Sequence, residues 1–574
     1  MTRRSVTHGL LCLLLSGVPS RSYAQNRVGR QGTKRVEKKL IAVGWDMPNA
    51  ERLRANYEVM DKLPFRGSSL RFTGRNNTPF LDFAHSRELW KPEDLAQITE
   101  DFAAAKPKRL THCFLDIKAT PGDVDWFDDA GWAIIVDHWR AAARVAKEGG
   151  VRGLLFDPES YRNAQFGYSS QPGAATHTFD EYRAMARRRG REVMAAVAEE
   201  YPDITMFSLF MLSIFPHQAA HSSPALAASR YGLYPAFIDG WLDTAPKGIT
   251  FVDGCESAYR FNSNEAHLAA ANLIRNTAQQ LISPENRYTY RAQVQVSFGI
   301  YLDAYVNPPD SSWYIDPGNQ TRVQRLEANL MSALNAADEY VWLYGEQASW
   351  WPTPHPKAGK KRWTELLPGV EGVLWSVADP VAHALRVIAK AGDNPANVLT
   401  NGDFSAKTGD APKGVQAADW VREGAPVGWS FWQSKAAKSE GNPGWDGGVG
   451  RGTPAAATLR AVRKGCLIQS VAVAPGERYA VQVWHRQAGQ GFPTVSIRWQ
   501  TAEGKWHAQH RDRSLFALES DREWRRQVGV VHVPEGTGRL VLLLNSSGQQ
   551  TKDDVIWWDD ALVMKGDSGD ALRQ

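Results

Sequence analysis

Two rhythms of apolar and polar residues divide the chain. Between Leu40 and Trp351, short runs of aliphatic, β-branched and aromatic residues alternate with longer stretches whose apolar residues recur at helical spacing. This alternation is typical of βα units and a parallel sheet. Eight such units over about three hundred residues predict a (β/α)₈ TIM-like barrel. The predicted strands are residues 40–46, 66–72, 109–118, 151–159, 204–212, 249–256, 292–303 and 340–346.

An open, doubly wound sheet is the alternative interpretation of the first rhythm. Such a sheet normally has a glycine-rich phosphate turn after its first strand. Here the first strand is followed by the sequence GWDMP at residues 44–48, which is not a turn of that kind. We therefore expect the barrel, as a catalytic domain over residues 40–390. Residues 369–388 are expected to form a last strand or helix that packs under it.

The second rhythm begins after a turn-rich linker at residues 391–396. Tyr479, Val481 and Val483 alternate with more polar neighbours, the period-2 pattern of a half-buried strand. Several short strands of this kind, separated by turns, predict an all-β sandwich over residues 397–566, with a tail at residues 567–574. The predicted strands are residues 458–462, 466–473, 478–485, 494–500, 527–533, 539–545 and 555–563.

Three motifs in the second region carry a family resemblance. The sequence reads NVLTNGDF at residues 397–404, PVGW at 426–429, and has Asp-Asp pairs at 553–554 and 559–560. This pattern resembles the CenC-like carbohydrate-binding modules over residues 397–566. The resemblance implies a jelly-roll fold, glycan binding and a structural calcium ion. It implies that Asp403, Asp559 and Asp560 would hold the calcium.

Tryptophan is unusually frequent, with 22 residues in the chain. Its flat indole stacks on apolar faces while its N–H finds a polar partner, and sugar rings offer such faces. Trp429 and Trp432 are the predicted sugar-binding residues of the sandwich. About two of its six candidate tryptophans are expected at the surface. The candidates are Trp429, Trp432, Trp445, Trp484, Trp499 and Trp506.

The N-terminus reads as an export signal. Two arginines, a short apolar stretch at residues 9–18 and a small-x-small site ending at Ala24 predict a signal peptide over residues 1–24. A basic leader at residues 25–39 follows, so the net charge of +5 lies at the N-terminus and the rest is slightly acidic. We expect a secreted or periplasmic monomer with no membrane span and no nucleic-acid partner. Cys113, Cys255 and Cys466 are expected to be buried free thiols.

The candidate chemistry lies at the predicted strand ends, where a parallel barrel places its working residues. Asp157 and Glu159 end the fourth strand and share one side of it, because side chains alternate along a strand. Two nearby carboxylates repel, which raises the pKa of one of them and makes it a proton donor. This ending looks like that of family 18 chitinase-like barrels, whose Glu is the acid, although the upstream part of their motif is absent. The resemblance implies that Glu159 is the general acid and that Asp157 is its partner or the nucleophile.

A second carboxylate is needed for glycoside hydrolysis, as nucleophile, base or stabiliser of the cationic transition state. Glu256 and Asp253 at the sixth strand end and Glu346 at the eighth are the alternatives. No cofactor is expected for catalysis. The loops after the strands interleave aromatic with polar residues, as a glycan cleft requires. The predicted substrate-binding residues of the barrel are Trp45, Tyr161, Asp253, Asp303, Trp350 and Trp351.

These observations favour an exported glycoside hydrolase with an appended glycan-binding module. The chain lacks the G-x-S-x-G elbow, the H-E-x-x-H helix and the Walker loop. One alternative is a polysaccharide lyase or esterase, which a cluster of arginines at the cleft would favour. Another is a non-catalytic glycan-binding protein with a decayed barrel, which predicts that Asp157, Glu159, Glu256 and Glu346 do not share one cleft.

Overall fold

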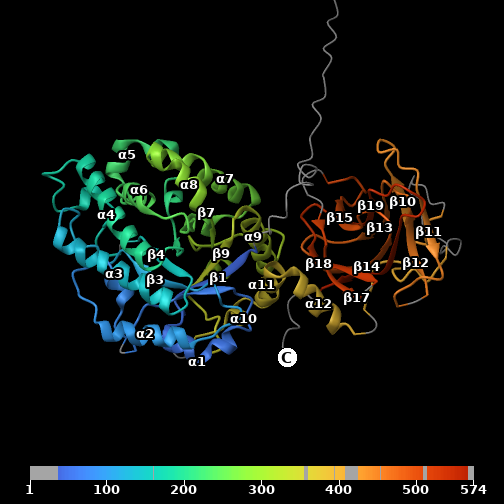
Figure 1. The fold of residues 1–574 in the computed structure, drawn as a ribbon, viewed down its shortest axis with the longest axis horizontal. Helices are drawn as coiled ribbons and strands as arrows, with labels where there is room; N and C mark the ends of the chain where they lie inside the picture. The colour runs from blue at the N-terminus through green and yellow to red at the C-terminus, as the bar shows by residue number, and fades with distance from the viewer. Residues whose placement is uncertain are drawn as a thin grey trace, which may run out of the picture. The chain divides into compact units, whose positions relative to one another are not determined.

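The computed structural model describes most of the chain from Glu37 onward (Figure 1). The predicted signal peptide, residues 25–36 of the basic leader and the tail at residues 567–574 lie outside the described residues. The described residues are 37–75, 77–159, 161–354, 360–392, 395–407, 424–452, 454–507, 513–521 and 523–566.

A closed parallel barrel forms the N-terminal part of the described chain. Its strands are hydrogen-bonded in the order β7-β6-β5-β4-β3-β2-β1-β9-β8, and all described pairings in this sheet are parallel. The strands are β1 (Lys39–Gly44), β2 (Gly67–Leu70), β3 (Phe114–Lys118), β4 (Gly153–Asp157), β5 (Thr205–Ser208), β6 (Thr250–Asp253), β7 (Val294–Val296), β8 (Phe298–Tyr301) and β9 (Tyr340–Gly345).

The two ends of this sheet belong to one stretch of chain. Only Ser297 separates β7, which pairs with β6, from β8, which pairs with β9. The two pieces therefore act as the seventh strand of an eight-stranded barrel and close it. Each of the eight predicted strands contains an observed strand, so the predicted (β/α)₈ fold is confirmed.

Helices connect the strands and lie around the barrel (Figure 1). Two of the long ones begin with capping boxes, in which Thr178 pairs with Glu181 and Thr321 with Gln324. The helices are α1 (Ala50–Met60), α2 (Pro92–Ala104), α3 (Asp129–Glu148), α4 (Phe179–Glu200), α5 (Ser223–Ala228), α6 (Tyr234–Thr244), α7 (Asn264–Arg275), α8 (Arg287–Gln293), α9 (Arg322–Ala336), α10 (Trp363–Leu366), α11 (Val370–Ala378) and α12 (Pro380–Lys390). Residues 369–388 thus form helices, one of the two expected outcomes.

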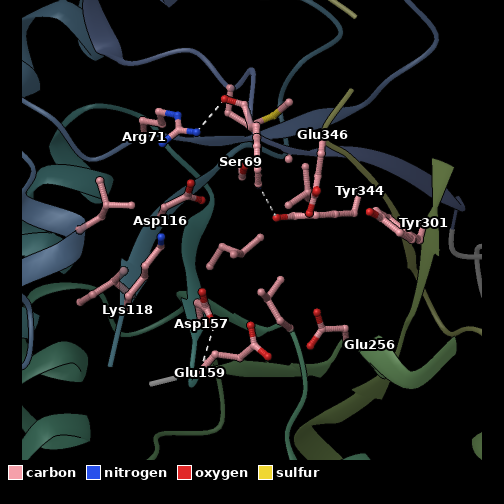
Figure 2. A pocket seen from close by; sticks show the side chains of 18 of the residues that line it. Ser69, Arg71, Asp116, Lys118, Asp157, Glu159, Glu256, Tyr301, Tyr344 and Glu346 are labelled. Carbon is pink, nitrogen blue, oxygen red and sulfur yellow. Dashed lines mark hydrogen bonds between the residues drawn. The ribbon is translucent and has the colours of Figure 1, made fainter. Parts of the chain in front are cut away.

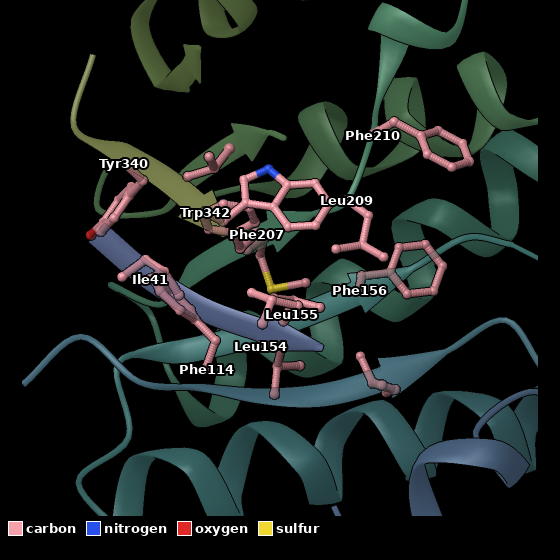
Figure 3. Packing of buried hydrophobic residues seen from close by; sticks show 14 of the residues in the cluster. Ile41, Phe114, Leu154, Leu155, Phe156, Phe207, Leu209, Phe210, Tyr340 and Trp342 are labelled. Atoms are coloured by element: carbon pink, nitrogen blue, oxygen red, sulfur yellow. The ribbon is translucent and has the colours of Figure 1, made fainter. Parts of the chain in front are cut away.

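Aromatic side chains pack together inside the barrel, towards the amino-terminal ends of its strands (Figure 3). The rings of Phe114, Phe207 and Tyr340, from β3, β5 and β9, pack edge to face with centroids 5.3 to 5.8 Å apart. Trp342, two residues after Tyr340, donates its indole N–H to the carbonyl of Gly254 at 2.8 Å. Such edge-to-face pairs add to the stability gained from apolar burial. The packed rings fill the barrel interior at the amino-terminal ends of the strands.

The outer face of the strands packs against the helices. Phe156 of β4 meets Trp139 of α3 and Trp241 of α6, with ring centroids 5.0 and 5.9 Å away. Because side chains alternate along a strand, Leu155 and Asp157 of β4 point into the barrel instead. This alternation decides which strand-end residues can reach a ligand.

The C-terminal part is a sandwich of two antiparallel sheets. One has the order β10-β13-β19-β15-β16 and the other β11-β12-β20-β14-β18-β17. All seven predicted strands are present, with four more, β10, β11, β16 and β17. The strands are β10 (Ser430–Gln433), β11 (Asn442–Asp446), β12 (Ala456–Arg460), β13 (Lys464–Ala472), β14 (Arg478–Ala488), β15 (Thr494–Gln500), β16 (Arg513–Ser514), β17 (Phe516–Asp521), β18 (Trp524–His532), β19 (Arg539–Ser547) and β20 (Val555–Lys565).

The motif at residues 397–404 fastens the start of the sandwich to its last strand. The amide of Asn397 donates to the carbonyl of Ala561 at 2.8 Å, and its oxygen accepts the N–H of Val563 at 3.0 Å. Phe404 is fully buried, and its ring packs on Trp429 with centroids 5.2 Å apart. The conspicuous residues of this motif therefore build the fold.

Two smaller expectations concern thiols and membrane spans. Cys113, Cys255 and Cys466 are free and buried, as predicted. None of the helices in the described ranges has the length and apolarity needed to cross a bilayer.

Candidate active site

A large cavity opens at the carboxyl ends of the barrel strands (Figure 2). Its volume is about 1220 Å³, and every strand of the barrel except the short β7 contributes a lining residue from its end or the loop that follows. The inward positions of the strands change in character towards this end. On β3 they run Phe114, Asp116, Lys118, and on β9 they run Trp342, Tyr344 before the chain reaches Glu346. The barrel interior is therefore apolar at the amino-terminal ends of the strands and polar at their carboxyl ends.

Four predicted catalytic carboxyl groups share this cavity. Asp157, Glu159, Glu256 and Glu346 all line it, and Figure 2 shows them around one space. They come from the ends of β4, β6 and β9, so residues far apart in the sequence converge. This is the arrangement in which TIM barrels carry out chemistry.

Asp157 fixes the loop that carries Glu159. Its Oδ1 accepts the backbone N–H of Glu159 at 2.9 Å. The hydroxyl of Tyr161 in turn donates a hydrogen bond to the Glu159 carboxylate. One hydrogen bond therefore fixes the backbone of Glu159 and another fixes its carboxylate. A carboxylate that reacts with substrate needs such a fixed position.

Burial is the main cause of the perturbed acidity of Asp157. It raises the pKa of Asp157 to about 7, helped by the negative charge of Glu159 and opposed by Lys118. Burial likewise raises the pKa of Asp116 to about 7, against the influence of Arg71 and Lys118. Both carboxyl groups are thus partly protonated near neutral pH.

Glu256 follows β6 in a short 3₁₀ helix, Glu256–Arg260. The preceding residue, Cys255, has a left-handed backbone with φ of 45°, which turns the chain sharply at this point. Burial first, and then the charges of Glu159 and Asp157, raise the pKa of Glu256 to about 8. Glu256 is therefore the carboxyl group best able to keep a proton at neutral pH.

Glu346 is placed by a buried carboxylate. Asp303, which is fully buried, accepts the backbone N–H groups of Glu346 and Gln347 at 2.9 and 3.0 Å. Burial and the charge of Asp303 raise the pKa of Glu346, while Tyr301 and Lys360 oppose the rise. Glu346 lines the cavity, whereas Asp303 lies behind it and positions the backbone of Glu346. This corrects the expectation that Asp303 contacts substrate.

One wall of the cavity is aromatic. Tyr259 stacks on Tyr301 and on Tyr344, with ring centroids 5.2 and 5.8 Å apart. Trp313 meets Tyr301 at 5.4 Å, and the half-exposed Trp45 donates its indole N–H to the Tyr344 hydroxyl at 3.1 Å. Of the predicted substrate-binding residues, Trp45 and Tyr161 line the cavity. The tyrosines of this wall were not predicted, although Tyr301 and Tyr344 stand at strand ends.

Basic side chains also line the cavity and were not predicted. Arg71 follows β2 and Lys118 ends β3, on the side opposite Tyr301 and Tyr344 (Figure 2). Isolated basic residues are common at strand ends, so the sequence offered no signal beyond their position. The other basic residues of the lining are Arg52, Arg260 and Lys360.

Asp253 has no place in the cavity lining, which corrects its prediction as a substrate ligand or catalytic partner. It lies on the same face of β6 as Phe251, which stacks on Trp241 of α6 outside the barrel. Its fully buried carboxylate accepts the backbone N–H groups of Met211 and Ser213 at 3.1 and 2.9 Å. Asp253 thus holds the loop after β5.

Trp350 and Trp351 are buried, which corrects the expectation that they bind sugar. Their relative exposures are 5% and 0%. Both pack on Phe65, with ring centroids 5.0 and 5.9 Å away. The loop after β9 uses these indoles to anchor itself to the barrel.

Among its described residues, the sandwich presents two tryptophans to solvent. Trp432 is 46% and Trp506 40% exposed, whereas Trp429 is buried and donates its N–H to the carbonyl of Asn401 at 3.2 Å. Trp429 is thus corrected from sugar ligand to core residue. Trp432 lies on β10 of the five-stranded sheet, and Trp506 forms an isolated bridge with Gln500 at the end of β15 of the same sheet. The guanidinium of Arg498 lies 4.2 Å from the centroid of the Trp506 ring.

The expected calcium ligands do not form a ligand set. The two carboxylate oxygens of Asp559 accept the backbone N–H groups of Arg451 and Asp560 at 2.6 and 2.7 Å. Asp560 pairs with the Arg451 side chain at 3.0 Å, and Asp403 accepts a hydrogen bond from Ser405. Among the described residues, no group of three acidic, His or Cys side chains is arranged to hold a metal.

Comparison with known proteins gives distant structural matches. No family model and no curated protein matches the sequence. The enzymatically active domain of tailspike protein 4 from bacteriophage CBA120 is 13% identical over 29% of this chain and 21% of that chain, with a TM-score of 0.22. TmCBM61 in complex with β-1,4-galactotriose is 15% identical over 29% of this chain and 98% of that chain, with a TM-score of 0.19. The CBM22-1–GH10 modules of endo-1,4-β-D-xylanase 10B from Clostridium thermocellum are 12% identical over 24% and 26%, also with a TM-score of 0.19. Matches this distant assign no role to any residue of the chain.

Proposed function

We propose that this protein is a glycoside hydrolase that cleaves a polysaccharide or oligosaccharide in the barrel cavity. The convergence of Asp157, Glu159, Glu256 and Glu346 on one cavity carries the proposal. Glycoside hydrolysis needs two carboxyl groups on either side of the scissile bond, one protonated and one ionised. A cavity that shifts its carboxyl groups to different extents meets that need.

In this proposal Glu256 is the general acid. Its pKa of about 8 keeps it protonated at neutral pH, so it can donate a proton to the glycosidic oxygen as the bond breaks. Glu159 is the second carboxylate, either attacking the anomeric carbon or taking a proton from the attacking water. Two hydrogen bonds support this role. The bond from the Glu159 backbone N–H to Asp157 fixes the loop, and the bond from the Tyr161 hydroxyl orients the Glu159 carboxylate.

This assignment differs from the one drawn from the sequence, which gave the acid role to Glu159. The sequence pattern marks a pair of carboxylates but contains no measure of their burial. The sequence pattern made Asp157 the electrostatic partner of Glu159 or the nucleophile, whereas here it is an electrostatic partner of Glu256, because its charge raises the pKa of Glu256. Glu346 and the aromatic wall would bind sugar hydroxyls and ring faces.

The two alternative functions have different standing. A decayed, non-catalytic barrel predicts scattered carboxylates, so the shared cavity supports catalysis over that alternative. A lyase or esterase remains the second candidate, because arginine and lysine side chains do line the cavity. Lyases act on uronic acids by removing a proton and leave an unsaturated product, which a hydrolase does not.

The sandwich would bind glycan through Trp432 and Trp506 on its exposed sheet face. Two such platforms would keep the enzyme near an insoluble substrate. Export by the predicted signal peptide agrees with a polymeric substrate, which cannot enter a cell.

The proposal is tested by release of reducing ends from a broad panel of polysaccharides. We expect release by the wild-type chain and at least about a 100-fold loss in Glu256→Gln and in Glu159→Gln. Glu148→Gln, at the exposed end of α3, is the matched control and should retain full activity. Absorbance of an unsaturated product would establish the lyase instead. No release from any glycan would overturn hydrolysis.

A further inference from the structure

The cavity has two chemically different walls. Tyr259, Tyr301 and Tyr344 form one, at the ends of the β6, β8 and β9 side of the barrel. Arg71 and Lys118 stand opposite, beside Asp116, at the ends of β2 and β3 (Figure 2). Aromatic rings suit the faces of a sugar ring, whereas two neighbouring cations suit a ligand that carries negative charge.

Arg71 is fixed in place by the chain around it. Its backbone N–H donates to the carbonyl of Pro48 at 2.9 Å, and one guanidinium nitrogen donates to the carbonyl of Trp45 at 2.6 Å. A guanidinium has five N–H donors, so this contact leaves others to face the cavity. The arginine is thus held in place by a backbone carbonyl, and its charge also lowers the pKa of the nearby Asp116.

Lys118 is held more loosely. Its ammonium lies 3.3 Å from Asp82, and the two side chains are 28% and 44% exposed. Ion pairs this exposed contribute little, so Lys118 can turn to a ligand at small cost. Lys118 also points into the cavity with Asp116, two residues earlier on the same face of β3.

Asp116 completes the wall with an unsatisfied atom. Its Oδ1 is buried and makes no hydrogen bond of normal geometry among the described residues, although the Ser69 hydroxyl helps to lower the pKa of Asp116. A buried polar atom without a partner is unfavourable unless a ligand supplies one. Burial raises the pKa of Asp116 to about 7, so the protonated group can donate a hydrogen bond to an acceptor oxygen.

We propose that Arg71, Lys118 and Asp116 form a subsite for an anionic substituent of a sugar ring, and that the substrate is an acidic glycan. Carboxylate and sulfate share the chemistry that this wall recognises, with several acceptor oxygens and a negative charge. Guanidinium and ammonium groups bind both, and two cations in a partly enclosed wall favour an anion over a hydroxyl. The inference rests on the proposed function for the role of the cavity, but the subsite is tested by binding.

The test is calorimetric titration of the full chain carrying Glu256→Gln, which prevents turnover. The ligands are an oligouronate, the same oligosaccharide with its carboxyl groups reduced to alcohols, and a sulfated neutral oligosaccharide of equal length. We expect the oligouronate or the sulfated ligand to bind about tenfold or more tightly than the neutral one. Adding Arg71→Gln or Lys118→Gln should remove most of that preference.

Three comparisons keep the result specific to the cavity. Lys106→Gln removes one exposed positive charge outside the cavity lining and should leave the preference unchanged. Arg71→Lys keeps the charge and should keep part of the preference, which guards against misfolding of Arg71→Gln. Trp432→Ala with Trp506→Ala removes the proposed glycan binding of the sandwich, so the binding that remains is assigned to the barrel.

Equal binding of charged and neutral ligands, or a preference untouched by both Arg71→Gln and Lys118→Gln, would overturn the subsite. Preference for the sulfated ligand alone would support it with sulfate as the substituent, and preference for the oligouronate would support carboxylate. Charge-selective binding without hydrolysis by the wild-type chain would reject the proposed function and leave the subsite standing.

Discussion

Oδ1 of Asp157 accepts the backbone N–H of Glu159 at 2.9 Å, so one carboxyl group of the pair positions the other. The pair also acts on a third group, because both charges raise the pKa of Glu256. Asp157 therefore affects both the position of Glu159 and the pKa of Glu256.

Asp157→Asn separates these two effects. The amide oxygen still accepts the Glu159 N–H, so the loop keeps its shape. Burial and the charge of Glu159 still raise the pKa of Glu256, but the contribution of the Asp157 charge is gone. We expect the alkaline limb of the pH–kcat/KM profile, near pH 8 in the wild type, to move to lower pH. Asp157→Ala loses the hydrogen bond as well and should lower activity further. An unchanged alkaline limb in Asp157→Asn would contradict the linkage.

Glu256→Gln should stabilise the protein at alkaline pH. The pKa of Glu256 is about 8 in the folded chain, whereas a glutamate in the unfolded chain has its ordinary pKa of about 4.3. Folding therefore binds a proton, and the stability linked to it is full below the unfolded pKa and is lost as pH rises through 8. The glutamine variant does not titrate, so its gain over wild type should reach about 2 kcal/mol or more at pH 9. Denaturant unfolding at pH 5 and pH 9 measures the gain, which should shrink towards pH 5.

Removing both exposed tryptophans should separate binding from catalysis. Trp432→Ala with Trp506→Ala leaves the barrel intact, so activity on soluble oligosaccharide should stay at the wild-type level. Affinity for insoluble polysaccharide should fall about thirtyfold, since two stacking rings of roughly 1 kcal/mol each are removed. Pull-down with the insoluble polymer measures retention. Equal retention by the variant and the wild-type chain would show that glycan binds elsewhere.

Removal of divalent metal should not destabilise the sandwich. The oxygens of Asp559 accept backbone N–H groups, and Asp560 is paired with Arg451. We expect the melting temperature to be the same in EDTA as in millimolar calcium. A clear rise with calcium, abolished by Asp559→Asn, would restore the calcium site that the family resemblance implies.

The sequence predicted the architecture well because the barrel and sandwich depend on regular patterns. The apolar runs identified all eight barrel strands, with the break at Ser297 inside one of them. The same pattern located Asp157 and Glu159, since strand ends in a parallel barrel meet at one face.

The sequence could not predict which strand-end residues point inward. Asp253 and Asp303 lie at or near the ends of predicted strands, as Asp157 does, yet both hold loops. The face on which a residue lies depends on where each strand begins, and a shift of one residue reverses it. Trp350, Trp351 and Trp429 show the same limit, because an indole suited to stacking on sugar is equally suited to a core.

The roles of Glu256 and Glu159 are tested most directly by changing the leaving group. An aryl glycoside of the released sugar with a good leaving group, such as dinitrophenolate, needs no proton from the enzyme, whereas a natural glycosidic bond does. We predict that Glu256→Gln retains activity on the aryl glycoside within about tenfold of wild type and loses about 100-fold or more on the natural substrate. Glu159→Gln should lose both. The reverse pattern, with aryl activity kept by Glu159→Gln and lost by Glu256→Gln, would contradict the account and return the acid role to Glu159.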